Sequence, residues 1–285
     1  PIMPKLVLID GSSYLYRAFH ALPPLTAADG TPTGALFGIV NMLKSSLKEN
    51  AEYIGFVLDA PGPTFRDALY PEYKANRAAM PDDLRAQVEP MMAIVQALGL
   101  PVIRVPGVEA DDVIGTFAVQ AAKDGVDVVI STGDKDFAQL VGPHIKLTNT
   151  MTGSVSDEQR VLEKFGVRPD QIVDYLALMG DAVDNVKGVE KCGPKTAAKW
   201  LAEFETLDAV IAHADKITGK IGENLRAALP ILPLNRTLVT IKTDVALDRD
   251  YTQLLQLPPH AEELTALYSR FGFKQALKEL QGADI

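Results

Sequence analysis

Four short apolar runs, rich in Val, Ile and Leu, alternate with helical patterns along the first half of the chain. They occupy residues 5–10, 53–59, 101–105 and 127–134. Runs that are apolar throughout are typical of strands buried on both faces of a parallel sheet. Strands that alternate with helices predict βαβ units. We therefore expect an α/β fold built on a parallel sheet.

The segments between these runs carry apolar residues at helical spacing. The predicted helices occupy residues 33–49, 81–98 and 109–123. Pro81, followed by two aspartates, is a favourable helix start, and Gly99 is a favourable stop. These apolar stripes are most simply core faces.

Helical patterns dominate from Asp157 onward, and only residues 241–247 read as one further short strand. We therefore predict two domains, a strand-rich core over residues 1–165 and a helical domain over residues 166–285. Residues 60–80 fit neither pattern, because they mix basic and aromatic side chains around an internal proline, Pro71. A long, poorly periodic segment beside a site is often a lid or binding loop, although composition alone slightly favours a solvated loop.

Carboxylates follow each of the four predicted strands and one predicted helix. Asp10, Asp59, the group Glu109, Asp111 and Asp112, and the pair Asp134 and Asp136 follow the strands, whereas Asp181 and Asp184 follow the helical stretch 172–179. In open α/β sheets the ligand site lies beyond the carboxyl ends of the strands, so we expect one shared crevice. Like charges repel by about 4 kcal/mol per pair at 4 Å with an effective dielectric near 20. The cluster therefore predicts bound divalent cations, with hard Mg²⁺ or Mn²⁺ before softer metals.

Glu109 has a second interpretation, because it stands at the start of a predicted helix. The helix dipole stabilises anions there, and for Glu109 alone this structural role and metal binding are equally favoured. Asp111 and Asp112 favour metal binding, since one charge is enough for the dipole.

Composition and charge narrow the choice of function only slightly. The net charge of −9 argues against a nucleic-acid ligand, but the nine clustered acids account for this excess. No apolar run approaches the roughly 20 residues that span a bilayer. The single cysteine, Cys192, fits a reducing cytoplasm. The four histidines show no zinc-ligand spacing.

The sequence Asp10-Gly-Ser-Ser13 weakly suggests three other sites. A dinucleotide site needs a glycine-rich turn there. A haloacid-dehalogenase-type phosphatase needs a second acid two residues after the first, where Ser12 stands. A response-regulator receiver is far shorter than this chain. Each of these alternatives lacks a feature that it requires.

A basic turn follows in the helical half. Gly188-Val-Glu-Lys-Cys-Gly193-Pro-Lys-Thr196 resembles a P-loop, but Pro194 intrudes before the lysine and no strand precedes it. A helical hairpin fits better, because Pro194 suits the first helical position and the free N–H groups after it would face a phosphate. Lys187, Lys191, Lys195 and Lys199 stand there against the single acid Glu190. This predicts a clamp on a nucleic-acid backbone, with a basic surface turn as the alternative; Trp200 reads as core.

These motifs together resemble one known family. The matching stretches are Leu8-Ile-Asp-Gly-Ser-Ser-Tyr-Leu-Tyr-Arg-Ala18, Thr64-Phe-Arg66, Tyr73-Lys-Ala-Asn-Arg77, Met80-Pro-Asp-Asp-Leu-Arg85, Gly107-Val-Glu-Ala-Asp-Asp-Val-Ile-Gly115, Ser131-Thr-Gly-Asp-Lys-Asp136, Leu176-Ala-Leu-Met-Gly-Asp181 and Gly193-Pro-Lys-Thr-Ala197. In this order they resemble the 5′-nuclease domain of bacterial DNA polymerase I, within the flap-endonuclease superfamily. The resemblance implies a PIN-like parallel sheet flanked by helices, a helical arch over about residues 60–90, and a C-terminal helical subdomain whose helix–turn–helix hairpin binds duplex DNA.

The resemblance also implies an activity and residue roles. It indicates a divalent-metal nuclease, using two or more Mg²⁺ or Mn²⁺ ions, that removes 5′ flaps, RNA primers and damaged 5′ ends in replication and repair. The metal positions are Asp10, Asp59, Glu109, Asp111, Asp112, Asp134, Asp136, Asp181 and Asp184. Lys74 and Arg77 take the catalytic positions of the arch, with Arg17 and Arg66 nearby. Tyr16 would stack on a base, and Tyr73, Lys187, Lys191, Gly193, Lys195, Thr196 and Lys199 would contact DNA, with K⁺ near residues 188–193.

The sequence departs from the family in two places. Gly180-Asp-Ala-Val-Asp-Asn185 replaces the common Gly-Asp-Ser-Ser-Asp-Asn, with both carboxylates retained, and Lys187 stands where proline is usual. Because stand-alone members usually lose carboxylates, the complete set favours a fragment joined to a polymerase domain. We expect a monomer in the bacterial cytoplasm, at the nucleoid and not at a membrane. A PIN-type ribonuclease and a catalytically silent DNA-binding module remain the alternatives.

Overall fold

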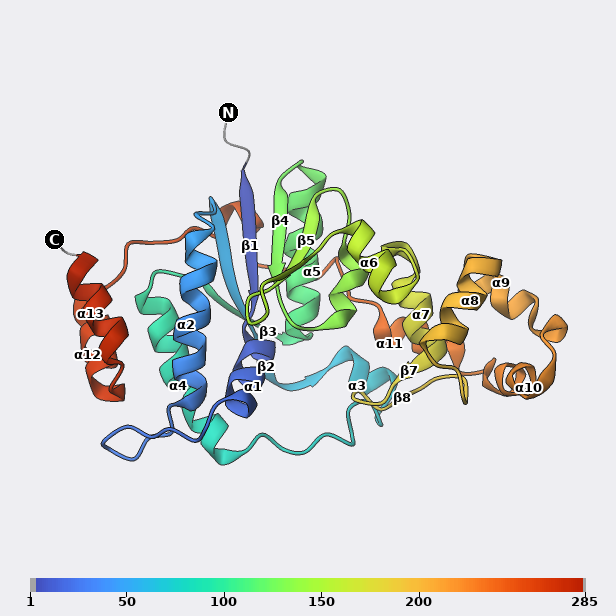
Figure 1. Ribbon diagram of the computed structural model, residues 1–285, viewed down its shortest axis with the longest axis horizontal. Helices are drawn as coiled ribbons and strands as arrows, with labels where there is room; N and C mark the ends of the chain where they lie inside the picture. Colours follow the sequence, from blue (N-terminus) through green and yellow to red (C-terminus); the bar gives the residue numbers. More distant parts are fainter. Residues whose placement is uncertain (1–3, 284–285) are drawn as a thin grey trace.

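A six-stranded sheet organises the first half of the computed structural model, which describes residues 4–283 (Figure 1). The strands lie in the order β3-β2-β1-β4-β5-β6. Their bounds are Lys5–Asp10 (β1), Tyr53–Thr64 (β2), Val102–Gly107 (β3), Asp127–Ser131 (β4), Ile145–Asn149 (β5) and Ser154–Ser156 (β6). β1 to β5 pair in parallel, and β6 pairs antiparallel to β5. The predicted α/β fold with a parallel sheet is confirmed.

Helices cover both faces of this sheet, as the apolar runs predicted. α1 (Gly11–Ala21), α2 (Gly34–Lys48) and α4 (Asp82–Ala97) pack on one face, and α5 (Ala110–Lys123) packs on the other. Alternate residues of β1 divide between the two cores: Leu6 and Leu8 join the core under α5, while Val7 and Ile9 join the core under α1 and α2. This is the period of two expected of a strand buried on both faces.

The segment 60–80 is more regular at its start than its composition predicted. β2 continues past Asp59 to Thr64, with a register shift against β3. The short helix α3 (Phe65–Leu69) then begins with a capping box, in which Thr64 and Asp67 satisfy each other's backbone N–H groups. Residues 70–80, which we call the arch segment, form turns and irregular backbone before α4.

The second half is helical, as predicted. Its elements are α6 (Glu158–Phe165), η2 (Pro169–Gln171), α7 (Ile172–Met179), β7 (Gly180–Asp181), β8 (Val186–Lys187), α8 (Pro194–Phe204), α9 (Leu207–Ala212), η3 (Ala214–Lys216), α10 (Gly219–Ala228) and α11 (Leu232–Val239). The 3₁₀ turn η1 (Lys135–Leu140) precedes them, between β4 and β5. β7 and β8 form a two-stranded hairpin between α7 and α8. Trp200 is buried, so its predicted role in the core is confirmed.

The strand predicted at residues 241–247 is absent from the described structure. The backbone there bonds to side chains of α5, because Lys242 N donates to Asp112 and Val245 N donates to Thr116. After η4 (Tyr251–Gln253), the chain crosses to the other side of the sheet, where α12 (Ala261–Phe271) and α13 (Lys274–Ala283) pack beside α2 and α4 (Figure 1). The last two helices of the predicted helical domain therefore lie against the core. Among residues 4–283, every helix is too short or too polar to cross a membrane.

Candidate active site

A cavity of about 510 Å³ opens at the carboxyl edge of the parallel sheet, where the topology places ligand sites. Eight of the nine predicted metal-ligating acids line it: Asp10, Asp59, Glu109, Asp111, Asp134, Asp136, Asp181 and Asp184. Tyr16, Arg17, Lys74 and Arg77 share its wall. The structure thus brings together carboxylates from five segments that lie up to 174 residues apart.

Hydrogen bonds hold three of these acids in place. Asp10 caps α1 by accepting from Ser13 N at 3.3 Å, and it also accepts from the Thr132 hydroxyl at 2.7 Å. Asp59 accepts from Ala110 N, in the first turn of α5, at 2.8 Å. Asp134 accepts from Asp136 N at 3.0 Å. Sequence reasoning missed Thr132, because a single threonine after a strand carries no local signal.

The β7–β8 hairpin carries two further acids, Asp181 and Asp184. Gly180 has a φ of +74°, and a Cβ there would lie 2.3 Å from the backbone nitrogen of Gly188. Only glycine suits that conformation and that close approach. Carboxylate oxygens of Asp136, Asp181 and Asp184 lie within 4.8 Å of one another. One buried oxygen of Asp136 has no hydrogen-bond partner among the described residues, so this group fits a divalent cation.

The pKa values of the pocket acids also favour a bound divalent cation. Burial raises the pKa of Asp10 to about 7, with a further rise from the neighbouring Asp134. Burial also raises the pKa of Asp111 well above its usual range, and Asp134 and Asp10 raise it further. For Asp136 the cause is burial and then the charges of Asp134 and Asp181. These pKa values rise because burial and neighbouring like charges both disfavour the ionised form. A site whose ligands are all oxygens suits hard cations.

Two basic side chains of the arch segment pair with acids of this pocket. Lys74 contacts Glu109, and Arg77 contacts Asp184. Burial alone lowers the pKa of Lys74, but the carboxylates of Glu109 and Asp184 raise it, and the net shift is upward. Lys74 and Arg77 therefore offset the charge of two of the eight pocket acids.

Hydrogen bonds to backbone carbonyls dock the arch segment onto residues 182–185. Lys74 N donates to the Asp184 carbonyl at 2.8 Å, and the Asn76 amide donates to the Ala182 carbonyl at 2.8 Å. In the other direction, the Asn185 amide donates to the Glu72 carbonyl at 2.7 Å. Lys74 and Asn185 both have left-handed backbones, with φ values of 57° and 59°. We call this set of contacts the arch latch.

Asp112 and Arg66 lie beneath the pocket, not in its wall. Asp112 is fully buried, and both of its oxygens accept from the Arg66 guanidinium at 2.8 Å. Asp112 also accepts from Glu109 N at 2.9 Å, which completes the cap of α5. Arg66 is 2% exposed and also donates to the carbonyls of Leu238 and Thr240. Asp112 and Arg66 therefore form a buried ion pair outside the pocket lining, and their expected roles in metal binding and catalysis stay predictions.

The other aromatic and basic residues near the pocket also differ in whether their side chains can reach a ligand. Tyr16 is 39% exposed on α1, so it can reach a ligand. Arg17 donates to the Gly133 carbonyl at 2.7 Å, and a Cβ at Gly133 would lie 2.1 Å from its guanidinium carbon. Tyr73 is buried, with its hydroxyl 3.2 Å from a Glu109 oxygen. The DNA contact expected for Tyr73 is therefore blocked by burial in this conformation.

The basic hairpin lies where α7 leads through β7–β8 into α8. Lys187, Lys191, Lys195 and Lys199 are all exposed, and none forms an ion pair with another described residue. Gly193 precedes α8, Pro194 takes the first helical position, and Thr196 is half-buried in the first turn. Four unpaired lysines beside a helix start suit the binding of phosphates.

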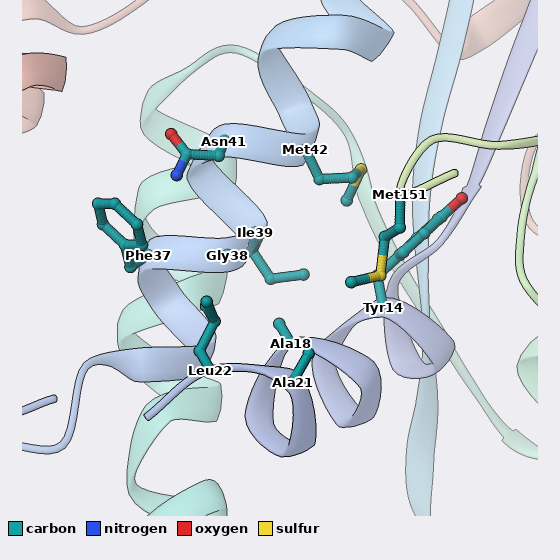
Figure 2. A pocket seen from close by; sticks show the side chains of 10 residues that line it. All are labelled: Tyr14, Ala18, Ala21, Leu22, Phe37, Gly38, Ile39, Asn41, Met42 and Met151. Atoms are coloured by element: carbon teal, nitrogen blue, oxygen red, sulfur yellow. The ribbon is translucent and has the colours of Figure 1, made fainter. Parts of the chain in front are cut away.

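A second cavity, of about 190 Å³, lies between α1 and α2 (Figure 2). Ala18, Leu22, Ile39, Met42 and Met151 face its interior. No acid or base of the described chain lines it. It therefore offers no chemistry for hydrolysis.

Two family models match the chain. Residues 5–166 match the 5′-3′ exonuclease N-terminal resolvase-like domain, and residues 167–262 match the 5′-3′ exonuclease C-terminal SAM fold. The chain is 54% identical over 288 residues to DNA polymerase I of Pseudomonas aeruginosa, covering 96% of this chain and 31% of that protein. It is 38% identical over 279 residues to a 5′-3′ exonuclease of Aquifex aeolicus, covering 98% of this chain and 96% of the other.

Solved structures with similar folds are more distant in sequence. The flap endonuclease of bacteriophage T5, in a complex with DNA and metal ions, has a TM-score of 0.70 at 21% identity and covers 97% of this chain and 98% of its own. The catalytic core of Rad2, in a complex with DNA substrate, has a TM-score of 0.66 at 17% identity and covers 99% and 93%. These two likenesses concern the fold.

Proposed function

Because the chain belongs to the 5′-3′ exonuclease family, we propose that it hydrolyses phosphodiesters near the 5′ ends of DNA with divalent cations held by its eight pocket carboxylates. The observation that carries this proposal is the group Asp136, Asp181 and Asp184, whose carboxylate oxygens lie within 4.8 Å of one another and include an unpartnered buried oxygen on Asp136. The chain spans about a third of the length of the DNA polymerase I relative. We propose that it is the N-terminal part of such a polymerase.

Six of the eight pocket acids divide into two groups, which adjoin each other because the charge of Asp134 raises the pKa of Asp136. Asp136, Asp181 and Asp184 would hold one cation. Asp10, Asp111 and Asp134 would hold a second, since the charge of Asp134 raises the pKa of both Asp10 and Asp111, and the charge of Asp10 raises that of Asp111. Two Mg²⁺ or Mn²⁺ ions would supply a hydroxide nucleophile and neutralise charge on the attacking and leaving oxygens. Asp112 is excluded from both groups, because Arg66 occupies its oxygens.

The basic residues act on the phosphate. Lys74 and Arg77 would leave Glu109 and Asp184 once cations bind there, and would then stabilise charge on the scissile phosphate. Arg17 lines the same pocket and donates to the Gly133 carbonyl. Arg66 orients the site from below, through Glu109 and Asp112. The products would be a 5′-phosphate and a 3′-hydroxyl.

The basic hairpin would hold the duplex beside the cut. Lys187, Lys191, Lys195 and Lys199 would contact phosphates without reading bases, and backbone carbonyls of residues 188–193 would hold a K⁺ ion. We propose 5′ flaps, nicks and RNA primers as substrates. We further propose that the protein acts as a monomer on DNA in the bacterial cytoplasm, at the nucleoid.

The test is cleavage of a 5′-flap duplex with Mg²⁺ and in excess EDTA, beside single-stranded RNA of the same length. Mg²⁺-dependent cleavage of the flap is expected. Equal cleavage in EDTA would contradict the metal mechanism. Preferred cleavage of the RNA would favour a PIN-type ribonuclease, and DNA binding without cleavage would favour a silent binding module.

A further inference from the structure

A small polar cavity adjoins the acidic pocket. It measures about 60 Å³ and lies among η1, β5, β6 and α6. Gly133, Asp134 and Lys135 line both this cavity and the acidic pocket. The two spaces are therefore separated by one stretch of three residues. A polymeric ligand with one unit in the acidic pocket can therefore place the neighbouring unit in the small cavity.

Two lysines give this cavity its charge. Lys135 comes from η1 and Lys164 from α6, and both are exposed. Neither forms an ion pair within residues 4–283, whereas Lys74 and Arg77 across the pocket are both paired. Lys164 lies over the ring of Phe165, with its ammonium nitrogen 5.3 Å from the ring centre. Asn149, Ser154 and Ser156 add polar side chains to the lining. Two ammonium groups and neutral donors beside one acid suit an anion.

The position of the cavity indicates which anion. α6, which carries Lys164, ends at Gly166, and a Cβ on Gly166 would lie 3.3 Å from the Cβ of Ala198 in α8. α8 also carries Lys195 and Lys199 of the basic hairpin. One helix that lines the cavity therefore contacts the helix that carries two lysines of the basic hairpin. It is far smaller than the acidic pocket of about 510 Å³, so it suits a group of a few atoms.

We propose that Lys135 and Lys164 bind one backbone phosphate of the substrate strand, next to the scissile phosphate and on the side of the basic hairpin. This inference rests on the proposed function, because the DNA must first occupy the acidic pocket. The proposed contact would fix the cut strand at the phosphate next to the scissile one. A phosphate held by two lysines carries no base preference.

The experiment compares charged and neutral phosphates. A 5′-flap duplex is made with a single uncharged methylphosphonate at each of the linkages around the cleavage site in turn. Binding of each duplex to the full chain is measured by fluorescence anisotropy in Ca²⁺ over a range of salt. At one linkage, the neutral group should weaken binding by roughly tenfold. It should also lower the slope of log affinity against log salt by about 0.9.

The double variant Lys135→Ala/Lys164→Ala should bind unmodified DNA more weakly by the same factor. It should lose no further affinity when the phosphate at that linkage is neutral. Lys135→Arg/Lys164→Arg should behave as the parent, because it retains both charges. The matched control is Lys123→Ala, at the end of α5 on the opposite edge of the sheet. It removes an exposed lysine and should keep the full loss at that linkage.

Two outcomes would overturn the inference. If the parent binds and cleaves the flap but the double variant shows the same loss at every linkage as the parent, the cavity holds no phosphate and the proposed function stands. If the parent neither binds nor cleaves flap DNA, both the inference and the proposed function fail.

Discussion

Lys74 and Arg77 pair with Glu109 and Asp184. A bound cation would compete for the same two carboxylates, because each oxygen has a limited number of lone pairs. The two basic residues therefore have one set of partners before the metal binds and another, the reacting phosphate, afterwards. Their effect should appear in the chemical step.

We predict that Lys74→Ala or Arg77→Ala lowers the single-turnover cleavage rate by about a hundredfold or more, as is usual when a donor to developing charge is lost. Duplex affinity should fall far less, since the lysines of the basic hairpin remain. Rapid-quench assays and anisotropy on the same flap substrate give the two quantities. Equal losses in rate and affinity would assign both residues to simple phosphate anchoring.

The pocket acids should cost stability when no metal is present. Asp111→Asn, Asp134→Asn and Asp181→Asn each keep the side-chain shape and remove one repelling charge. Each variant should be nearly inactive, yet melt at a higher temperature than the parent in EDTA. Added Mg²⁺ should shrink this gain, because the parent then gains binding free energy. Thermal melts with and without Mg²⁺ measure the effect.

Asp112→Asn is the matched control for these variants. Asp112 stands next to Asp111 in the sequence, but its partner is Arg66 in a buried ion pair. Removing one charge of a buried pair costs about 3 kcal/mol, so this variant should melt lower in EDTA and in Mg²⁺ alike. A higher melting temperature for Asp112→Asn in EDTA would place it among the metal ligands.

Sequence spacing could not separate Asp111 from Asp112. Both stand in the first turn of α5, and both follow the same strand. The difference arises from Arg66, 46 residues earlier, whose guanidinium fits Asp112 from below. The same limit applies to Tyr73, whose burial against Glu109 has no local sequence signal.

At the scale of elements, the local sequence pattern predicted an element correctly where that element's own periodic apolar face stabilises it. α2, α4 and α5 end within a residue or two of the predicted bounds, because their apolar stripes face a core. The predicted strand at residues 241–247 failed because its apolar residues pack on α5, while its backbone bonds to Asp112 and Thr116. β2 exceeded its predicted length, because Pro61 and Pro63 lie where it leaves its register with β3 and they interrupt no ladder.

The basic hairpin belongs to this scale, because its four lysines act together. Replacing Lys195 and Lys199 with Ala should weaken duplex binding for every sequence tested. The slope of log affinity against log salt should fall by about two phosphate contacts. Anisotropy titrations on two unrelated duplexes measure both effects. An unchanged slope would leave the hairpin as a solvated basic surface.

At the scale of the whole molecule, the site exists only where the two halves of the chain meet. The sheet supplies Asp10, Asp59 and Asp134, and the helical half supplies Asp181 and Asp184. The sequence predicted the first group from the ends of strands, a property of sheet topology. The docking of the arch segment onto residues 182–185 could not be predicted, because over 100 residues separate the partners.

Proton binding should make the stability of the metal-free protein depend on pH. The pKa of Asp10 rises from its usual 3.8 to about 7 on folding, so between these values the folded protein binds a proton that the unfolded chain does not. Its contribution is fully present below pH 4 and is lost as pH rises through 7. The melting temperature in EDTA should therefore fall by several degrees from pH 5 to pH 8. Asp10→Asn should flatten this profile, and a melting temperature that rises with pH would contradict the assignment.

The arch latch also has a consequence for the rate at which DNA enters the pocket. Contacts of Lys74, Asn76 and Asn185 close the arch segment against residues 182–185, so they must break before a strand can pass beneath it. A required opening step makes association slower than diffusion. In stopped-flow mixing, the observed rate should level off as the concentration of flap DNA increases. Asn76→Ala should raise that plateau, whereas a rate that grows linearly for both proteins would show that the arch is already open.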